Sequence, residues 1–164
     1  MCFPLGLNDV PRVPSFIWMD IKLNVEKYKR REDRPPMDLF HIGEHYENLL
    51  TAMVGNPDKF REDLTYIKRE LQKGFIARIS EKDPTDINIG FMCENGRHRS
   101  VAMCRLVLEV LTRQGFTRVN GPVHLDRASW TTHQCTDCEL CDPQYSRKQQ
   151  LYNIALERWT SIAV

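Results

Sequence analysis

The sequence lacks a dominant charge and any long apolar run. Its 164 residues carry 23 Lys and Arg against 22 Asp and Glu, so a formal net charge of +1 produces no overall basic field for nucleic acid. No apolar run approaches the ~20 residues that a membrane-spanning helix needs. The composition, 41% hydrophobic and 27% charged, is ordinary for a globular protein. We therefore expect one compact domain with no membrane partner, which binds any polyanion through a local patch.

Signals for export and for lipid attachment are also missing. The start of the chain, from Met1 to Asp9, has neither the charged beginning nor the apolar core of a secretory signal. Cys2 stands where myristoylation needs a glycine, and the carboxyl end offers no prenylation cysteine. We expect an intracellular, cytoplasmic protein. In that compartment its six cysteines favour free thiols or a metal site over disulfides.

Apolar periodicity predicts interleaved strands and helices. Short runs of bulky apolar residues predict strands at residues 15–22 and 87–93, and residues 117–126 carry a weaker strand pattern. Apolar positions at helical spacing predict helices at residues 43–54, 58–74, 101–114 and 144–162. We expect an α/β fold, a single three-layer-like domain with a small mixed sheet flanked by helices.

No internal repeat, low-complexity tract or linker divides the chain. We assign residues 1–14 to an amino-terminal extension and residues 15–132 to the main domain. Residues 133–164 form a cysteine-rich knuckle and a terminal helix, which we expect to pack on the same domain. The sequence leaves the oligomeric state open, and a homo-oligomer is one of the assemblies it allows.

The strongest chemical signal is the loop between a predicted strand and a predicted helix. It reads Cys93-Glu94-Asn95-Gly96-Arg97-His98-Arg99-Ser100. A glycine-containing loop that opens a helix directs backbone N–H groups at one spot, where the helix dipole adds positive potential. The guanidinium, imidazole and hydroxyl groups add donors suited to phosphate oxygens. We expect a phosphorylated small molecule to bind at Asn95, Gly96, Arg97, His98, Arg99 and Ser100; in the alternative, Ser100 only caps the helix and the arginines are solvated.

The same loop satisfies the C-x5-R-[ST] motif of cysteine-dependent phosphatases. Cys93, Arg99 and Ser100 would occupy the motif's catalytic positions, with the thiolate attacking phosphorus and the arginine binding equatorial oxygens. Against this, Glu94 lies beside the nucleophile, where its charge opposes both thiolate formation and binding of a phosphate dianion. We therefore expect binding rather than enzymatic activity, with the phosphatase as the alternative.

A phosphatase also needs a separate carboxylic acid to protonate the leaving group. Asp86, Asp126 and Asp142 are all conceivable in this role. None of them lies in a recognisable acid-bearing loop, so the sequence does not choose among them.

More of the chain resembles a second class of protein. The loop and the strand before it are similar to the segment I-G-C-T-G-G-x-H-R-S-V in the carboxyl-terminal domain of the RNase adapter protein RapZ family. The matching residues are Ile89-Gly90, Cys93, Gly96 and the run from His98 to Val101. Residues 16–24 are similar to the family's V-F-D-V-R-F-L-P-N, and residues 123–127 to its late histidine segment. The resemblance covers about residues 15–127.

The resemblance implies a regulatory adaptor that binds a phosphosugar and RNA. In such a domain Asn95 to Ser100 would bind the phosphate, Lys22 would stand where the family has an arginine, and His124 would occupy the late histidine position. The P-loop nucleotide-binding domain that usually precedes this domain has no counterpart motif in the chain. Glu94 replaces a threonine and Asn95 a glycine of the family's loop, which leaves the identity of the ligand open.

A cluster of cysteines near the carboxyl end has the spacing of a metal site. His133, Cys135, Cys138 and Cys141 offer one imidazole and three thiols, the ligand types that Zn²⁺ takes tetrahedrally. His124 or Cys104 could replace His133 as the fourth ligand. Iron–sulfur ligation of the C-x2-C-x2-C-x3-C type would need a fourth cysteine at position 145, where Tyr145 stands. We expect a structural zinc site.

Two further features have ordinary and functional interpretations. The basic stretch Lys27, Lys29, Arg30, Arg31 and Arg34 is either a solvated surface or a contact for the RNA backbone. His41 and His45 are four residues apart but lack the metalloprotease glutamate next to the first histidine. We interpret them as surface or capping histidines.

Overall fold

The computed structural model describes residues 2–5, 16–20, 42–55, 57–81, 87–93, 97–116, 119, 121, 123 and 145–164. In chain order these form β1 (Cys2–Leu5), β2 (Phe16–Asp20), α1 (Tyr46–Val54), α2 (Pro57–Glu81), β3 (Asn88–Met92), α3 (Arg99–Arg113) and α4 (Tyr145–Thr160). The described residues are mainly helical. Each of the four expected helices is present, as are the strands expected near residues 15–22 and 87–93.

The strands form a three-stranded sheet in the order β1-β3-β2. Both neighbours run parallel to β3, with Cys2 beside Ile89 and Phe16 beside Asn88. The described strand pairs therefore include no antiparallel pair, and the expected mixed sheet is not shown. In a parallel arrangement the carboxyl ends of all three strands lie at one edge of the sheet, which matters for the site described below.

Strand β1 was not expected from the sequence, which assigned residues 1–14 to an extension. Its four residues are too short for a clear alternating pattern, and Pro4 within them argues against a central strand. An edge position tolerates proline, because one side of an edge strand needs no ladder hydrogen bonds. The pairing partner, β3, lies more than eighty residues away in the sequence.

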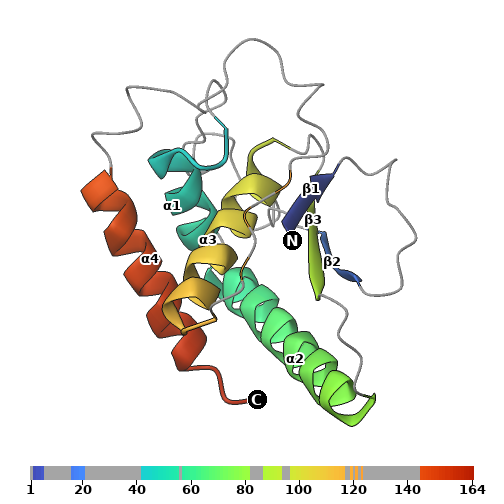
Figure 1. The fold of residues 1–164 in the computed structure, drawn as a ribbon. Helices are drawn as coiled ribbons and strands as arrows, with labels where there is room; N and C mark the ends of the chain where they lie inside the picture. Colours follow the sequence, from blue (N-terminus) through green and yellow to red (C-terminus); the bar gives the residue numbers. More distant parts are fainter. Residues whose placement is uncertain are drawn as a thin grey trace.

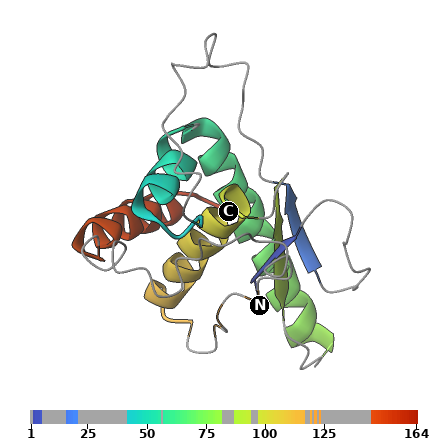
Figure 2. The ribbon, with the colours of Figure 1, turned by 90° about the horizontal axis from the view of Figure 1, so that it is seen from above.

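Helix α3 lies between the sheet and the helices α1 and α4 (Figures 1 and 2). It contacts β1 and β3 on one side and α1 and α4 on the other. Its sequence explains this position, because ten of its 15 residues are buried and its apolar surface is far wider than a single stripe. A third layer beyond the sheet is not among the described elements.

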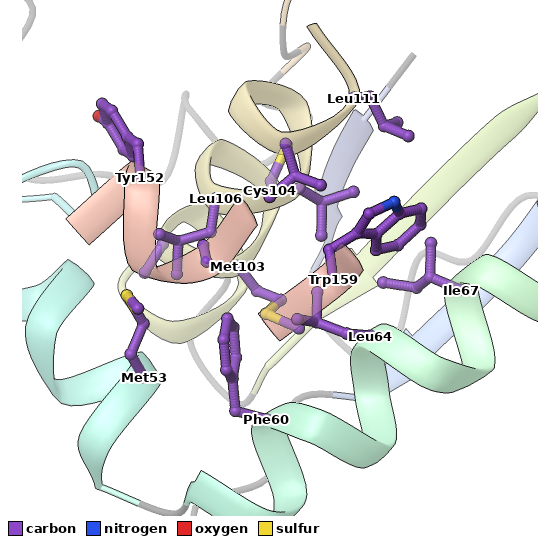
Figure 3. Close-up of a cluster of buried hydrophobic side chains, with 14 of the residues drawn as sticks. Met53, Phe60, Leu64, Ile67, Met103, Cys104, Leu106, Leu111, Tyr152 and Trp159 are labelled. Atoms are coloured by element: carbon purple, nitrogen blue, oxygen red, sulfur yellow. The ribbon is translucent and has the colours of Figure 1, made fainter. Parts of the chain in front are cut away.

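The main core gathers side chains from all four helices and from β3 (Figure 3). Met103 and Leu106 of α3 are at its centre, and both are almost completely buried. Burying a side chain of this size contributes about 1.5 to 3 kcal/mol. Tyr152 and Trp159 bring α4 into the same core, so the terminal helix packs directly on the domain.

Helix α2 extends beyond Gly74, where the sequence pattern predicted its end. A Cβ at Gly74 would lie 3.2 Å from the side chain of Ile87, so the helix passes the chain leading into β3 closely at this point. Just beyond, Phe75 stacks on Phe116, with ring centroids 5.6 Å apart. These tertiary contacts favour continuation of the helix despite the intrinsic cost of glycine.

Helix α3 ends as predicted at Gly115. This glycine has a φ of 88°, a left-handed conformation that residues with side chains rarely adopt. Its N–H donates to the carbonyl of Thr112 at 3.1 Å, and the next N–H, of Phe116, donates to that of Leu111 at 3.2 Å. This pair of hydrogen bonds is the Schellman motif, which satisfies carbonyls that the helix leaves open.

The strand expected at residues 117–126 is not shown. Val119, Gly121 and Val123 are outside any strand, and the remaining positions are outside the described residues. Val119 is partly buried and packs against the main core. Among the described helices, none combines the length and the apolar character needed to span a membrane.

Candidate functional site

The candidate loop lies at the carboxyl edge of the sheet. Cys93 directly follows the central strand β3, and Arg99 is the first residue of α3. The ends of the flanking strands, Leu5 and Asp20, both pair with Met92. In open parallel sheets, ligands bind in the crevice at this edge. Glu94, Asn95 and Gly96, at the middle of the loop, are outside the described residues.

The amino terminus of α3 is not neutralised by its own side chains. His98 occupies the N-cap position and makes no side-chain capping hydrogen bond, and the first turn contains no acidic residue. The first amides of a helix have no acceptor within it, and together with the dipole they form a positive end. Ser100 lies inside the helix, so the alternative in which it serves as the cap is wrong.

Cys93 and Ser100 join the two ends of the loop. The Cys93 thiol donates a hydrogen bond to the Ser100 hydroxyl, with 3.2 Å between Sγ and Oγ. The two residues are 2% and 0% exposed. This contact ties the end of β3 to the first turn of α3 in a place that water does not reach. It also means that the thiol is not presented to solvent.

The cationic residues of the loop differ in exposure. Arg97 and Arg99 are half-buried, whereas His98 is buried. Both arginines thus keep some contact with solvent, although the Nε atom of Arg97 is buried. The structure brings Cys93, Arg97, His98, Arg99 and Ser100 together, because they flank a single strand-to-helix connection.

A turn from another part of the chain supports this connection. Gly43 donates its backbone N–H to the carbonyl of Arg97 at 3.0 Å. Ile42 packs on Val101, and the two form a small apolar cluster of their own. We call residues 42–45 the supporting turn. Sequence reasoning missed its role, since Gly43 looked only like the start of a helix.

Buried polar groups fix the supporting turn. The carbonyl of Ile42 accepts the His45 N–H at 3.0 Å and the side-chain amide of Asn48 at 3.1 Å. Asn48 and His45 are 2% and 5% exposed. Because His45 is buried, its interpretation as a surface residue is wrong. It occupies the N-cap position of α1, as the capping alternative expected, but its side chain makes no capping hydrogen bond. His41 is outside the described residues.

Several predicted site residues are outside the described residues. They include the two positions expected beside the phosphate loop, the basic stretch, the candidate acids and the cysteine knuckle: Lys22, His124, Lys27, Lys29, Arg30, Arg31, Arg34, Asp86, Asp126, Asp142, His133, Cys135, Cys138 and Cys141. Cys104 is described, and it is buried in the core and does not form a disulfide. Within the described ranges, no group of three or more His, Cys, Asp or Glu residues is placed to bind a metal.

Asp20 is a carboxylate residue at the site edge that the sequence analysis did not consider. It is the last residue of β2 and pairs with Met92, directly before Cys93. Only the strand order reveals this proximity, because more than seventy residues separate the two positions in the sequence. The parallel register therefore adds Asp20 to the candidate acids.

A second polar cluster joins α3 to α4 away from the loop. Arg105 forms an ion pair with Glu109 at 2.8 Å, and Arg113 lies 3.6 Å from the same carboxylate. Arg113 also donates to Asn153 at 2.5 Å and to Gln149. The guanidinium of Arg113 lies 5.6 Å from the ring centre of Tyr152. We call Arg105, Glu109, Arg113 and Tyr152 the helix-pairing cluster.

Burial and hydrogen bonding shift two pKa values in this cluster. Burial raises the pKa of Tyr152, and its hydrogen bond with Arg105 offsets this only in part. Burial lowers the pKa of Arg105, but the bond with Tyr152 and the nearby charge of Glu44 outweigh that effect and raise it. Glu44 belongs to the supporting turn, so the turn also interacts electrostatically with Arg105 in the second turn of α3.

Comparisons of the chain with protein-family models, with curated proteins and with solved structures give no match. The similarity to the RapZ family therefore stays a prediction based on the residues quoted above.

Proposed function

We propose that this protein binds a phosphorylated small molecule, of the phosphosugar type, between Cys93 and Ser100, and acts as a regulatory adaptor. One observation carries the proposal: the uncapped amino terminus of α3 lies beside Arg97 and Arg99 at the carboxyl edge of the central strand. A phosphate group there would accept hydrogen bonds from helix amides and from guanidinium groups at the same time.

Burial of the thiol favours binding over turnover. A cysteine nucleophile must reach phosphorus, yet Cys93 is 2% exposed and already donates to Ser100. The contact instead supports a structural role for both residues, in which they set the distance between β3 and α3. The adaptor role derives from the resemblance to the RapZ family.

Calorimetric titration tests this proposal. Glucosamine-6-phosphate should bind, and glucosamine without the phosphate should not. Arg99→Ala should weaken binding by about 10- to 100-fold, the value of one hydrogen bond between charged groups. Arg61→Ala, which removes an exposed arginine of α2, is the matched control and should leave the affinity unchanged. The absence of heat with every phosphate ester, or equal affinity in Arg99→Ala, would refute the proposal.

A cysteine-dependent phosphatase is the second candidate, and the placement of Cys93 and Arg99 at the two ends of one strand-to-helix connection favours it. The thiolate would attack phosphorus, the ester oxygen would leave with a proton from an acid, and water would hydrolyse the phosphocysteine. Turnover of p-nitrophenyl phosphate that is lost in Cys93→Ser and reduced in Asp20→Asn would establish this activity, and no turnover would exclude it for this substrate.

RNA is the second ligand that we propose, bound through the basic stretch from Lys27 to Arg34. When basic side chains neutralise the phosphates of RNA, counterions are released from the RNA. The affinity for RNA should therefore fall steeply as the salt concentration rises. Lys29→Glu with Arg30→Glu should weaken binding and flatten the salt dependence by about two units of slope. Retention of the wild-type slope would argue against this surface.

We also propose a structural zinc ion at His133, Cys135, Cys138 and Cys141. The donor set of one imidazole and three thiolates supports this site. Metal analysis should give one zinc per chain, and a strong chelator should lower the melting temperature. Cys138→Ser should lose the metal. A metal-free preparation with unchanged melting temperature would remove the zinc from the proposal.

A further inference from the structure

Gly43 in the supporting turn lies so close to the backbone at the start of α3 that a side chain there would collide with it. We infer that Gly43 is a positioning residue for the phosphate site, which sets the orientation of the peptides from Arg97 to Ala102 without touching the ligand. The inference rests on the proposed function, since it concerns the same loop. It adds a residue that no motif in the loop contains.

The space at Gly43 admits no side chain. A Cβ at this position would lie 2.0 Å from the carbonyl oxygen of His98 and 2.4 Å from the amide nitrogen of Ala102. It would also lie 2.8 Å from the Cβ of Val101. The first two atoms belong to the backbone, which cannot rotate away as a flexible side chain can. Any other residue at 43 must therefore displace the start of α3 or the turn itself.

The contact also orients a hydrogen-bond donor of the loop. Gly43 holds the carbonyl of Arg97 through its N–H at 3.0 Å. In a trans peptide the carbonyl and the following N–H point in opposite directions. The direction of the Arg97 carbonyl therefore determines the direction of the His98 N–H. The next carbonyl, of His98, accepts the N–H of Ala102 at 2.8 Å and begins the hydrogen bonding of α3.

The supporting turn is itself anchored, so it can act as a rigid support. Asn48, on the first helical turns of α1, donates to the carbonyl of Ile42 from a fully enclosed position. The Ile42 side chain packs on Val101, which is on α3 next to Ser100. The support thus runs from α1 through Ile42 and Gly43 to the peptides that open α3. A positioning shell of this kind controls how precisely a binding site is preorganised.

The direct test is Gly43→Ala, with Gly121→Ala as its matched control. A Cβ at Gly121 would meet nothing within 4 Å, so this variant makes the same chemical change without a collision. In titrations with glucosamine-6-phosphate, Gly43→Ala should bind about 10-fold or more weakly, the loss expected when a charged hydrogen bond is misaligned. Gly121→Ala should bind as the wild type does.

Weaker binding must be separated from lower stability. Leu151→Ala removes a core side chain of α4 and serves as a destabilised control. While each variant is still folded at the assay temperature, Leu151→Ala should retain the wild-type affinity and Gly43→Ala should not. Equal losses of affinity in the two variants would mean that Gly43 is only structural, and would overturn the inference.

Hydrogen exchange gives a readout that needs no ligand. The amide of Ala102 bonds to His98 beside Gly43, so its exchange should quicken about 10-fold or more in Gly43→Ala relative to amides in the middle of α3. If the wild type binds no phosphate ester, the proposed function fails, and this exchange measurement still decides whether Gly43 orders the loop. If the wild type binds the ester, and Gly43→Ala shows the same affinity and the same exchange rate at Ala102 as the wild type, only the positioning role is overturned.

A second variant covers the case in which Gly43→Ala does not fold. Asn48→Leu removes the amide donor to Ile42 and adds no atom near the loop. It should weaken ligand binding by several-fold and quicken exchange at Ala102, because the carbonyl of Ile42 loses one of the two hydrogen bonds that it accepts. If Asn48→Leu folds with wild-type affinity and exchange, the turn does not position the loop.

Discussion

The two halves of α3 are stabilised by different kinds of contact. At the amino terminus, the contacts are buried and involve backbone groups or small side chains: Gly43 with Arg97, Ile42 with Val101, and Cys93 with Ser100. From Arg105 to the carboxyl terminus, long and partly exposed polar side chains form the helix-pairing cluster around the buried Tyr152 of α4. Core residues are buried along both halves of the helix. We call its amino terminus the rigid end and its carboxyl terminus the adaptable end, because backbone contacts cannot rearrange as long side chains can.

This difference has a physical consequence for function. A close backbone contact leaves no space for a larger side chain. If a substitution displaces the peptide, the hydrogen-bond donors of that peptide move with it. Exposed ion pairs can be exchanged or lost, since solvent and side-chain entropy reduce their value to about 0 to 1 kcal/mol. The candidate ligand site is at the rigid end, where preorganised donors are most useful.

The largest loss of stability should come from shortening a side chain in the core that both halves of α3 share. Leu106→Ala should lower the free energy of unfolding by about 2 to 5 kcal/mol, because it deletes a fully buried side chain and leaves a cavity. Urea denaturation measures this loss. Val54→Ala, at an exposed position of α1, should change stability by less than about 0.5 kcal/mol. A small effect of Leu106→Ala would mean that the core is not organised around α3.

The next largest loss of stability should come from the buried contact between Cys93 and Ser100 at the rigid end. Ser100→Ala should cost about 1 to 2 kcal/mol, because it leaves the enclosed Cys93 thiol without its acceptor. In a double-mutant cycle with Cys93→Ala, the two changes should be coupled by about 1 kcal/mol. Strictly additive losses would show that the thiol and the hydroxyl do not interact.

The helix-pairing cluster should show a pH dependence. Because the pKa of Tyr152 is raised in the folded protein, its stabilising contribution is complete below its unfolded pKa of about 10 and is lost as the pH rises through the folded value. Tyr152→Phe should cost about 1 kcal/mol at neutral pH through the lost bond with Arg105. Denaturation of both proteins from pH 7 to 11 should show the wild-type advantage shrinking above pH 10, and a constant difference would contradict this.

The smallest effect should come from the surface arginine of the adaptable end. Arg113→Ala removes contacts with Glu109, Gln149 and Asn153, yet should cost only about 0.5 kcal/mol. Its binding of glucosamine-6-phosphate should equal that of the wild type. A loss larger than that of Ser100→Ala would reverse the comparison between the two ends of α3.

Local patterns predicted much of this fold. The apolar spacing of residues 101–114 and the glycine at 115 correctly predicted α3 and its end, because both signals act within a few residues. The order of the strands in the sheet could not be predicted, because β1 and β2 pair with a strand that is far away in the sequence. Such pairing produces no pattern among neighbouring residues. For the same reason α2 passes its expected stop at Gly74, where contacts with Ile87 and Phe116 outweigh helix propensity.

The sequence revealed the side chains of the candidate site that could bind phosphate, but it did not reveal the residues that position them. Cys93, Arg99 and Ser100 were recognisable because one loop contains all three. The hydrogen bond between Cys93 and Ser100 depends on how the loop folds back, which the motif alone does not specify. Asp20 and Gly43 had no signal that linked them to the loop, because strand register and helix packing create those proximities.

By itself, the sequence determined the approximate positions of the helices and the set of cationic groups at the start of α3, because these depend on neighbours along the chain. The tertiary structure alone decided that β3 is the central strand and that Gly43 contacts the peptides at the start of α3. The reason is that hydrogen bonds between distant segments form only after the core has brought those segments together.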